Sequence, residues 1–146
     1  MLQFSQFLAT WCCCVFTGAA IYINFVEHPA RMGCDTKTAA TVWAPSYKRA
    51  TAMQAPLAVL SCLAGILAWL LGGSVIWLAG ACMIGLVLPV TFLVIMPTNK
   101  RLLAEGRDLA SAETRALLHT WGRLHAIRSV LSLLSSVIYV GSLVRA

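Results

Sequence analysis

The chain has 146 residues, of which 60% are hydrophobic and 11% are charged, and its formal net charge is +6. A soluble domain is nearer half apolar, with about a quarter of its residues charged, so the composition excludes an ordinary soluble protein. It indicates an integral membrane protein of one domain, residues 1–146, because the chain is too short for two.

Four apolar stretches are long enough to cross a bilayer. The hydrocarbon core is about 30 Å thick, and a helix needs about 20 apolar residues to span it. The stretches are approximately residues 5–27, 55–73, 74–97 and 122–144. We therefore predict an all-α fold, an integral membrane four-helix bundle.

The first stretch is interpreted as a retained span and not as a cleaved signal peptide. Residues 1–26 contain no Lys or Arg, so the positively charged start of a signal peptide is missing. The Gly-Gly pair in "LLGGS" (70–74) predicts a tight turn between the second and third spans. Pro89 is predicted to kink the third span, and Pro97 to end it.

The basic residues predict the orientation of the spans. Four Lys and Arg residues lie between the first and second spans, six lie between the third span and the start of the fourth, and only Arg145 lies on the other side. The positive-inside rule places both large loops in the cytoplasm and both termini on the non-cytoplasmic side of a bacterial inner membrane or its equivalent. The net charge therefore reflects orientation and contact with lipid, and we expect no nucleic acid partner.

Both cytoplasmic connections are expected to contain helix. "WAPSYKRATAMQAP" (43–56) predicts a short interfacial helix that starts at Pro45, with Trp43 and Tyr47 as headgroup anchors. Ser111 is a predicted N-cap with Glu113 in the first turn, and that helix is expected to run unbroken into the fourth span.

The fourth span carries a polar stripe. Its members follow one another at steps of 4, 3, 4, 3 and 4 residues, which places them on one face of a helix. They are Trp121, His125, Arg128, Ser132, Ser135 and Tyr139.

The first and third spans also bring polar residues to their cytoplasmic ends. The first span has a stripe that includes Asn24 and ends at Glu27 and His28, and "MPTNKRL" places Asn99 and Lys100 at the end of the third. Ionisable groups at membrane depth are costly, so they usually face the bundle interior and one another. We expect a pocket in this layer, and its candidate residues are Glu27, His28, Asn99, Trp121, His125 and Arg128.

Structural roles also fit several of these residues. Arg128 can extend to the headgroups or form an ion pair with Glu27, and His125 can bond a neighbouring carbonyl. Ser132 and Ser135 can serve close helix packing. We expect His119 to be exposed on the connecting helix. The six Cys residues are interpreted as buried, unpaired thiols, because five of them lie inside apolar runs and none form a CxxC pair.

Two site chemistries are compatible with this layer. Glu27, His28 and His125 are the ligand types of a two-His, one-carboxylate iron site, but adjacent Glu27 and His28 point about 100° apart on a helix. Binding one metal would require the helix to end there, at Pro29. We therefore predict no cofactor, and keep a non-haem iron or other divalent metal as the alternative.

The second chemistry needs no metal. His125 or His28 acts as a general base, and Arg128 stabilises the resulting anion together with Asn99 and Trp121. In this hypothesis Glu27 orients the His or the Arg.

Three segments of the sequence resemble the anthrone oxygenase family, some of whose bacterial members carry a label for a domain of unknown function. They are "INFVEHPAR" (23–31), "LVIMPTNKRL" (93–102) and "WGRLHAIRS" (121–129). The His-Pro after the first span, the Pro-x-Asn after the third and the Trp-x3-His-x2-Arg before the fourth carry the resemblance, which covers nearly the whole chain.

The resemblance implies a small helical membrane enzyme that oxidises an anthrone to an anthraquinone with O2, so its partners would be a small aromatic substrate and O2. By motif match it implies active-site roles for His28, Asn99, His125 and Arg128, and less directly for Glu27 and Trp121. Asn24 and Tyr139, on the polar stripes, are further candidates for orienting a substrate.

The sequence therefore predicts a membrane oxygenase that acts on an activated polycyclic phenol or a similar carbon acid. The alternative is a non-enzymatic binding or transport subunit whose polar stripes line a pathway. The non-cytoplasmic half of the spans is poor in polar residues, which disfavours a channel. Four short spans are also compatible with a homo-oligomer, although the sequence assigns no surface to it.

Overall fold

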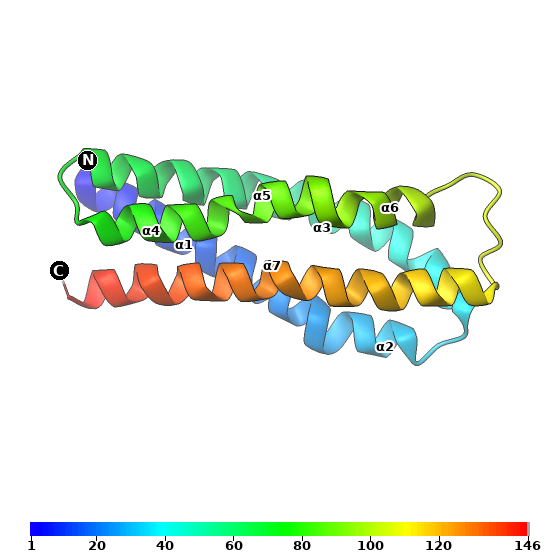
Figure 1. Cartoon of the computed structure of the whole chain (residues 1–146). Coiled ribbons are helices and arrows are strands. Elements are labelled where there is room, and N and C mark those ends of the chain that lie inside the picture. The colour runs from blue at the N-terminus through cyan, green and yellow to red at the C-terminus, as the bar shows by residue number, and fades with distance from the viewer. Residues whose placement is uncertain (146) are drawn as a thin grey trace.

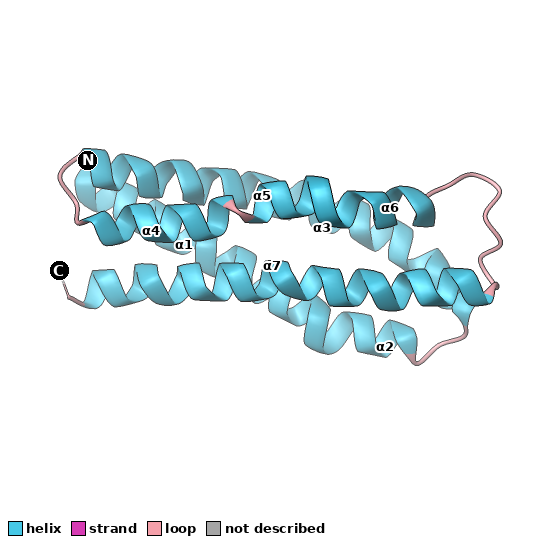
Figure 2. Ribbon diagram, viewed as in Figure 1, coloured by secondary structure: helices cyan, strands magenta, loops and turns pink. Residues whose placement is uncertain are grey.

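The computed structural model describes residues 1–145, and within that range every regular element is a helix (Figure 2). Short interruptions divide two of the four rods of the bundle. The elements are α1 (Leu2–Tyr22), η1 (Ile23–Glu27), α2 (His28–Met32), α3 (Thr36–Leu70), α4 (Val75–Gly85), α5 (Val87–Pro89), η2 (Val90–Ile95), α6 (Met96–Leu102) and α7 (Ala112–Val144). The four rods are long and apolar enough to cross a membrane, which confirms the predicted number of spans.

The rods run side by side along the bundle, with α1 and α4 each packed against both α3 and α7 (Figure 1). The N-terminus, the C-terminus and the turn between α3 and α4 gather at one end, here called the terminal end. The connections 33–35 and 103–111 lie at the opposite end, here called the loop end. The two basic connections therefore share one end, as predicted.

Side-chain caps explain where the long helices begin. The Asp35 carboxylate accepts hydrogen bonds from the Thr38 N–H at 3.0 Å and the Thr38 hydroxyl at 2.6 Å, which starts α3. These bonds hold the pKa of the Asp35 carboxyl below its usual range. The Ser111 hydroxyl accepts from the Thr114 N–H at 3.1 Å, and α7 runs from there without a break, as predicted.

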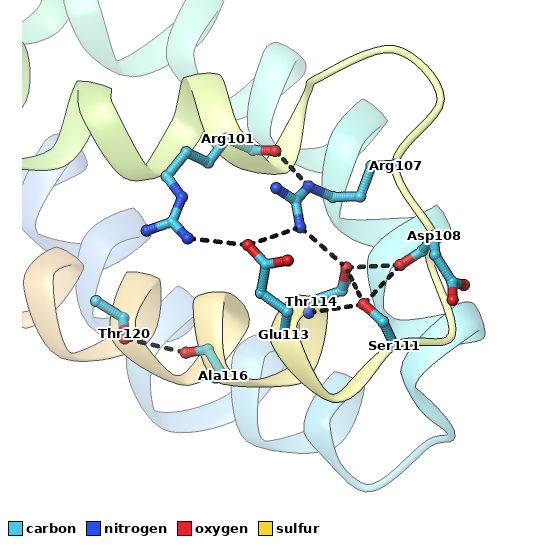
Figure 3. A network of polar contacts seen from close by, with 8 residues as sticks. All are labelled: Arg101, Arg107, Asp108, Ser111, Glu113, Thr114, Ala116 and Thr120. Atoms are coloured by element: carbon cyan, nitrogen blue, oxygen red, sulfur yellow. Dashed lines mark hydrogen bonds and ion pairs between the residues drawn. The ribbon is translucent and has the colours of Figure 1, made fainter.

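Polar contacts hold the connection between α6 and α7 (Figure 3). Glu113 accepts a hydrogen bond from Arg101 at 2.9 Å and forms an ion pair with Arg107 at 3.5 Å. The Thr114 hydroxyl donates to the carbonyl oxygen of Asp108 at 2.8 Å. Exposed ion pairs contribute little stability, so these contacts mainly fix the path of the chain.

The prolines do not divide the rods as predicted. Helix α3 passes through Pro45 and Pro56 without interruption, so the prediction of a separate interfacial helix over 43–56 is wrong. Trp43 is 1% exposed and packs inside the bundle, where tertiary contacts outweigh the backbone bonds that proline removes.

The other two rods also continue past their expected ends. Pro97 lies in the first turn of α6, which extends to Leu102, and the first rod continues past Glu27 through α2 with Pro29 in its first turn. In both rods the π-helical segment just before the proline, η1 or η2, changes the backbone hydrogen bonding where the proline has no N–H to donate. The predicted disturbance at Pro89 is present, because the backbone changes there from α-helix to the wider π-helix of η2.

Two apolar clusters fill the bundle. One includes Phe16, Trp77 and Tyr139, and the other includes Trp43 and Trp121. Ring stacking joins Trp77 to Tyr139 at a centroid distance of 5.2 Å. All six cysteines are free, but only Cys12 and Cys13 are buried, so the prediction of buried thiols is wrong for the exposed Cys14, Cys34 and Cys82.

The Tyr139 ring lies in a slot made by Gly65 and Gly80. A methyl group added at Gly80 would collide with the ring, whereas one added at Gly141 would meet open space. We expect Gly80→Ala to destabilise the bundle by about 1–3 kcal/mol, as overpacking does. Thermal unfolding in detergent, with Gly141→Ala as the matched control, measures this, and equal melting temperatures would contradict the slot.

Candidate functional site

The predicted polar stripe of α7 faces the bundle interior. All six of its members are buried, and Gly122, Ser129 and Ser136 beside them are buried too. The helical spacing alone was sufficient to predict this face.

The half of the stripe toward the terminal end is used for helix packing. Ser136 bonds the Thr17 hydroxyl at 2.7 Å, and Ser135 donates to the carbonyl oxygen of Gly80 at 2.8 Å. Tyr139 lies 14 residues beyond His125 in the same helix, which is about 21 Å along the axis. The structure therefore places Tyr139 in the apolar core and away from the other candidates.

Asn24 organises the half toward the loop end. Its Nδ2 donates to the carbonyl oxygen of Gly122 at 3.0 Å, which fixes the orientation of the amide. Its Oδ1 then faces the Ser129 hydroxyl at 2.6 Å and Nδ1 of His125 at 2.6 Å. Because Oδ1 can only accept, Nδ1 of His125 carries the proton of the neutral ring. Nε2 of His125 is left with a free lone pair.

Arg128 is a buried cation without a carboxylate partner. It is 8% exposed, donates from Nη2 to Oε1 of Gln54 at 2.7 Å, and lies 5.4 Å above the Phe16 ring. Its Nε has no hydrogen-bond partner, and no ion pair reaches it in residues 1–145. An unneutralised charge at this depth is costly, so Arg128 is the candidate in this layer for pairing with an anion.

His125 and Arg128 line the same small cavity. Its volume is about 10 Å³, enough for roughly one water molecule. Glu27, Tyr47 and Gln54 also line it. A second cavity of about 70 Å³ shares Tyr47, Thr51 and Arg128 with the first. Its remaining lining residues are Phe16, Ala55, Ala58, Val87, Leu88, Thr91, Phe92 and Met96.

Glu27 does not pair with Arg128, so that hypothesis is wrong. Its carboxylate forms an ion pair with Arg31, four residues later, and accepts a hydrogen bond from Ser46. Sequence reasoning missed Arg31, which is 6% exposed, although the i,i+4 spacing on one helix face was an available signal. It also missed Gln54 and Ser129.

His28 and His125 both pack against the ring of Trp121. The indole is 5.2 Å from the His28 ring and 5.0 Å from the His125 ring, measured between centroids. His28 also lies over Gly122, where an added methyl group would collide with its ring.

These positions do not fit the alternative metal site. Each imidazole packs against the indole of Trp121, and the carboxylate of Glu27 is engaged with Arg31. Within the described part of the chain, no three His, Cys, Asp or Glu side chains come together as metal ligands.

Asn99 and His119 line neither of the two cavities. Asn99 is 1% exposed, with no hydrogen-bond partner at either amide atom, and it lines neither cavity. It forms no hydrogen bond with Arg128 or His125, and its catalytic role stays a prediction. His119 is exposed, as expected.

Comparison with known proteins identifies the family. Residues 43–138 match the family model described as anthrone oxygenase. The chain belongs to the anthrone oxygenase family. It is also similar to the anthrone oxygenase tpcL of Aspergillus fumigatus, with 39% identity over 62 residues. That match covers 40% of this chain and 38% of the relative, and no solved structure matches the chain.

The matched region of this anthrone oxygenase family member contains most, but not all, of the layer. Trp121, His125 and Arg128 lie inside it, whereas Asn24 and His28 precede it. The residue that orients His125 therefore comes from outside the part of the chain that the family model covers.

The Asn24 network predicts a single tautomer for His125. Nitrogen NMR of protein that carries ¹⁵N label in its three histidine rings should show one neutral ring that is protonated at Nδ1 and unprotonated at Nε2. Loss of that signal in His125→Gln assigns it, and Asn24→Ala should give a mixture of tautomers. A wild-type His125 ring protonated at Nε2 would contradict the network.

Proposed function

We propose that this protein is a membrane-bound oxygenase of the anthrone oxygenase type, which oxidises an activated polycyclic phenol or a similar carbon acid with O2. One observation carries the proposal: the free Nε2 of His125 and the unpaired guanidinium of Arg128 line one cavity. Membership of the family supports the reaction class.

The first step is removal of a proton from carbon. An anthrone has a methylene between two aromatic rings, and its deprotonation gives an electron-rich phenolate. Nε2 of His125 accepts the proton, and Asn24 keeps the ring in the tautomer that can do so. The general base in this proposal is His125, because the Nδ1 of His28 has no partner that fixes its ring.

Arg128 stabilises the phenolate oxygen. Its guanidinium is buried, so its field is weakly screened. The hydrogen bond to Gln54 aims the group without neutralising it, because an amide carries no charge. The anion formed by proton removal therefore neutralises the positive charge of Arg128, which no carboxylate of the described residues neutralises.

The anion then reacts with O2 directly. It transfers one electron to O2, and the carbon radical and superoxide combine to form a C–O bond. The peroxide takes the proton back from His125. Water is then lost, formed from the outer oxygen with its proton and the second hydrogen of the methylene, and a carbonyl remains. The balance is CH2 + O2 → C=O + H2O, with carbon oxidised and O2 fully reduced.

The proposal includes the orientation in the membrane. The positive-inside rule assigns the loop end to the cytoplasm, because this end holds both basic connections. The polar layer of His125 and Arg128 would then lie near the cytoplasmic interface. The transport alternative has less support, since Ser135 and Ser136 toward the terminal end bond other helices and Tyr139 is fully buried.

Oxygen uptake with emodin anthrone tests the two catalytic roles. His125→Gln should lower turnover about 10²–10⁴-fold through loss of the base, and Arg128→Gln about 10²–10³-fold through loss of anion stabilisation. The exposed His119→Gln and Arg123→Gln are matched controls on the same helix and should keep wild-type rates. Full activity in both site variants, with folding confirmed by circular dichroism, would refute the assignment.

Chelation tests the metal-free step. Uptake by protein dialysed against EDTA should equal that of untreated protein, because no step in the proposal uses a metal. Loss of activity on chelation, restored by ferrous iron, would overturn direct reaction with O2. The His28→Gln variant would then show whether His28 is a ligand.

A further inference from the structure

The second cavity runs from a buried end to the outer face of the bundle. Its inner end is formed by Phe16, Ala58 and Val87, which are 0–2% exposed. Its mouth lies between α3 and η2, where Ala55 is exposed and Phe92 is 63% exposed. Both residues belong to helices apolar enough to cross a membrane, so the mouth opens toward lipid and away from water.

The lining of this cavity carries one charge and is otherwise mostly apolar. Arg128 supplies a positive charge, and it is the one charged residue among those that line this cavity. The other side chains are mostly apolar, and the Thr91 hydroxyl is engaged with the carbonyl oxygen of Val87 at 2.7 Å. Such a lining is complementary to a molecule with one acidic oxygen and an otherwise apolar body.

The two cavities meet at residues they share, which are Tyr47, Thr51 and Arg128. A ligand whose oxygen lies at Arg128 can therefore extend its rings into the second cavity, here called the larger cavity. Its acidic carbon then faces the small cavity, which His125 lines. The larger cavity, at about 70 Å³, is well below the roughly 300–1,000 Å³ of ordinary ligand pockets. It holds one end of a flat ring system, and the rest projects through the mouth.

Local backbone geometry makes the mouth. Pro89 has no N–H to donate, and the π-helix that follows presents Thr91 and Phe92 beside α3. On α3 the facing residues are alanines, Ala55 and Ala58, which leave a slot. A slot between a small-residue face and an aromatic ring favours flat molecules over branched ones.

We propose that the larger cavity is the ring-binding subsite, and that flat aromatic acids reach it sideways from the bilayer through the slot between Ala55 and Phe92. This inference rests on the proposed function for the chemistry that follows binding. The occupant is a polycyclic phenol whose ionised oxygen pairs with Arg128.

Closing the mouth tests the proposal. Ala55→Phe fills the slot from an exposed position, where a larger side chain does not disturb the core. Ala52→Phe is the matched control, because Ala52 is exposed on the same helix and lines neither cavity. The probe is emodin, a hydroxyanthraquinone, whose binding to protein in lipid nanodiscs is followed by its absorbance.

We expect Ala55→Phe to raise the Kd for emodin at least about 10-fold, which is about 1.4 kcal/mol. The same variant should lower kcat/KM for emodin anthrone by a similar factor. Ala52→Phe should leave both values within about 2-fold of wild type. Arg128→Gln should also weaken emodin binding, whereas His125→Gln should stop turnover and leave binding intact.

The outcomes separate the subsite from the reaction. Equal Kd values in Ala55→Phe and Ala52→Phe would overturn the subsite, even if His125→Gln still abolishes turnover. Weakened binding in Ala55→Phe without anthrone turnover by the wild type would support the subsite and overturn the proposed function. Displacement of emodin by equimolar oleate would overturn the aromatic occupant in favour of a fatty acid.

Discussion

The close crossing of the first rod and α7 at Gly122 is the constraint on which the site depends. Gly122 has no side chain, so the His28 ring lies over its backbone and Asn24 reaches its carbonyl oxygen. That one bond turns the Asn24 amide, and the amide then selects the tautomer of His125. The crossing occurs where η1 gives the first rod a wider turn, a departure from α-helix that is frequent at functional sites.

The two buried arginines, Arg31 and Arg128, have different kinds of partner. Arg31 has a carboxylate partner in Glu27 and a hydroxyl partner in Ser46, so it serves as structure. Arg128 has a neutral amide and an aromatic face, which hold it in place and leave its charge available. The same residue type at similar burial thus has a structural role in one place and, as proposed, a catalytic role in the other. The difference lies in the partner.

Helical periodicity explains which features could be predicted from the sequence. The buried face of α7 followed from spacing, because side chains separated by three and four residues must share a face. The same rule could have found the partner of Glu27, because Arg31 lies four residues later in the same rod. The contact of Arg128 with Gln54 did not follow, since it depends on which helix approaches α7 and at what depth. The continuity of α3 through Pro45 and Pro56 was missed for a similar reason: local rules favour an end, and packing of Trp43 overrides them. The interruption at η1 comes just before Pro29, which has no N–H to donate to a carbonyl one turn earlier, so the sequence did contain a signal for it.

As proposed, the mouth between Ala55 and Phe92 faces the hydrocarbon of the membrane. An enzyme served from that side responds to the mole fraction of substrate in the bilayer and not to its concentration in the surrounding buffer. Extra lipid or detergent would therefore act as a diluent in two dimensions and raise the apparent KM with no change at the protein. A hydrophobic substrate would also be concentrated by partitioning into the bilayer before it met the protein, so a modest intrinsic affinity would be sufficient for binding.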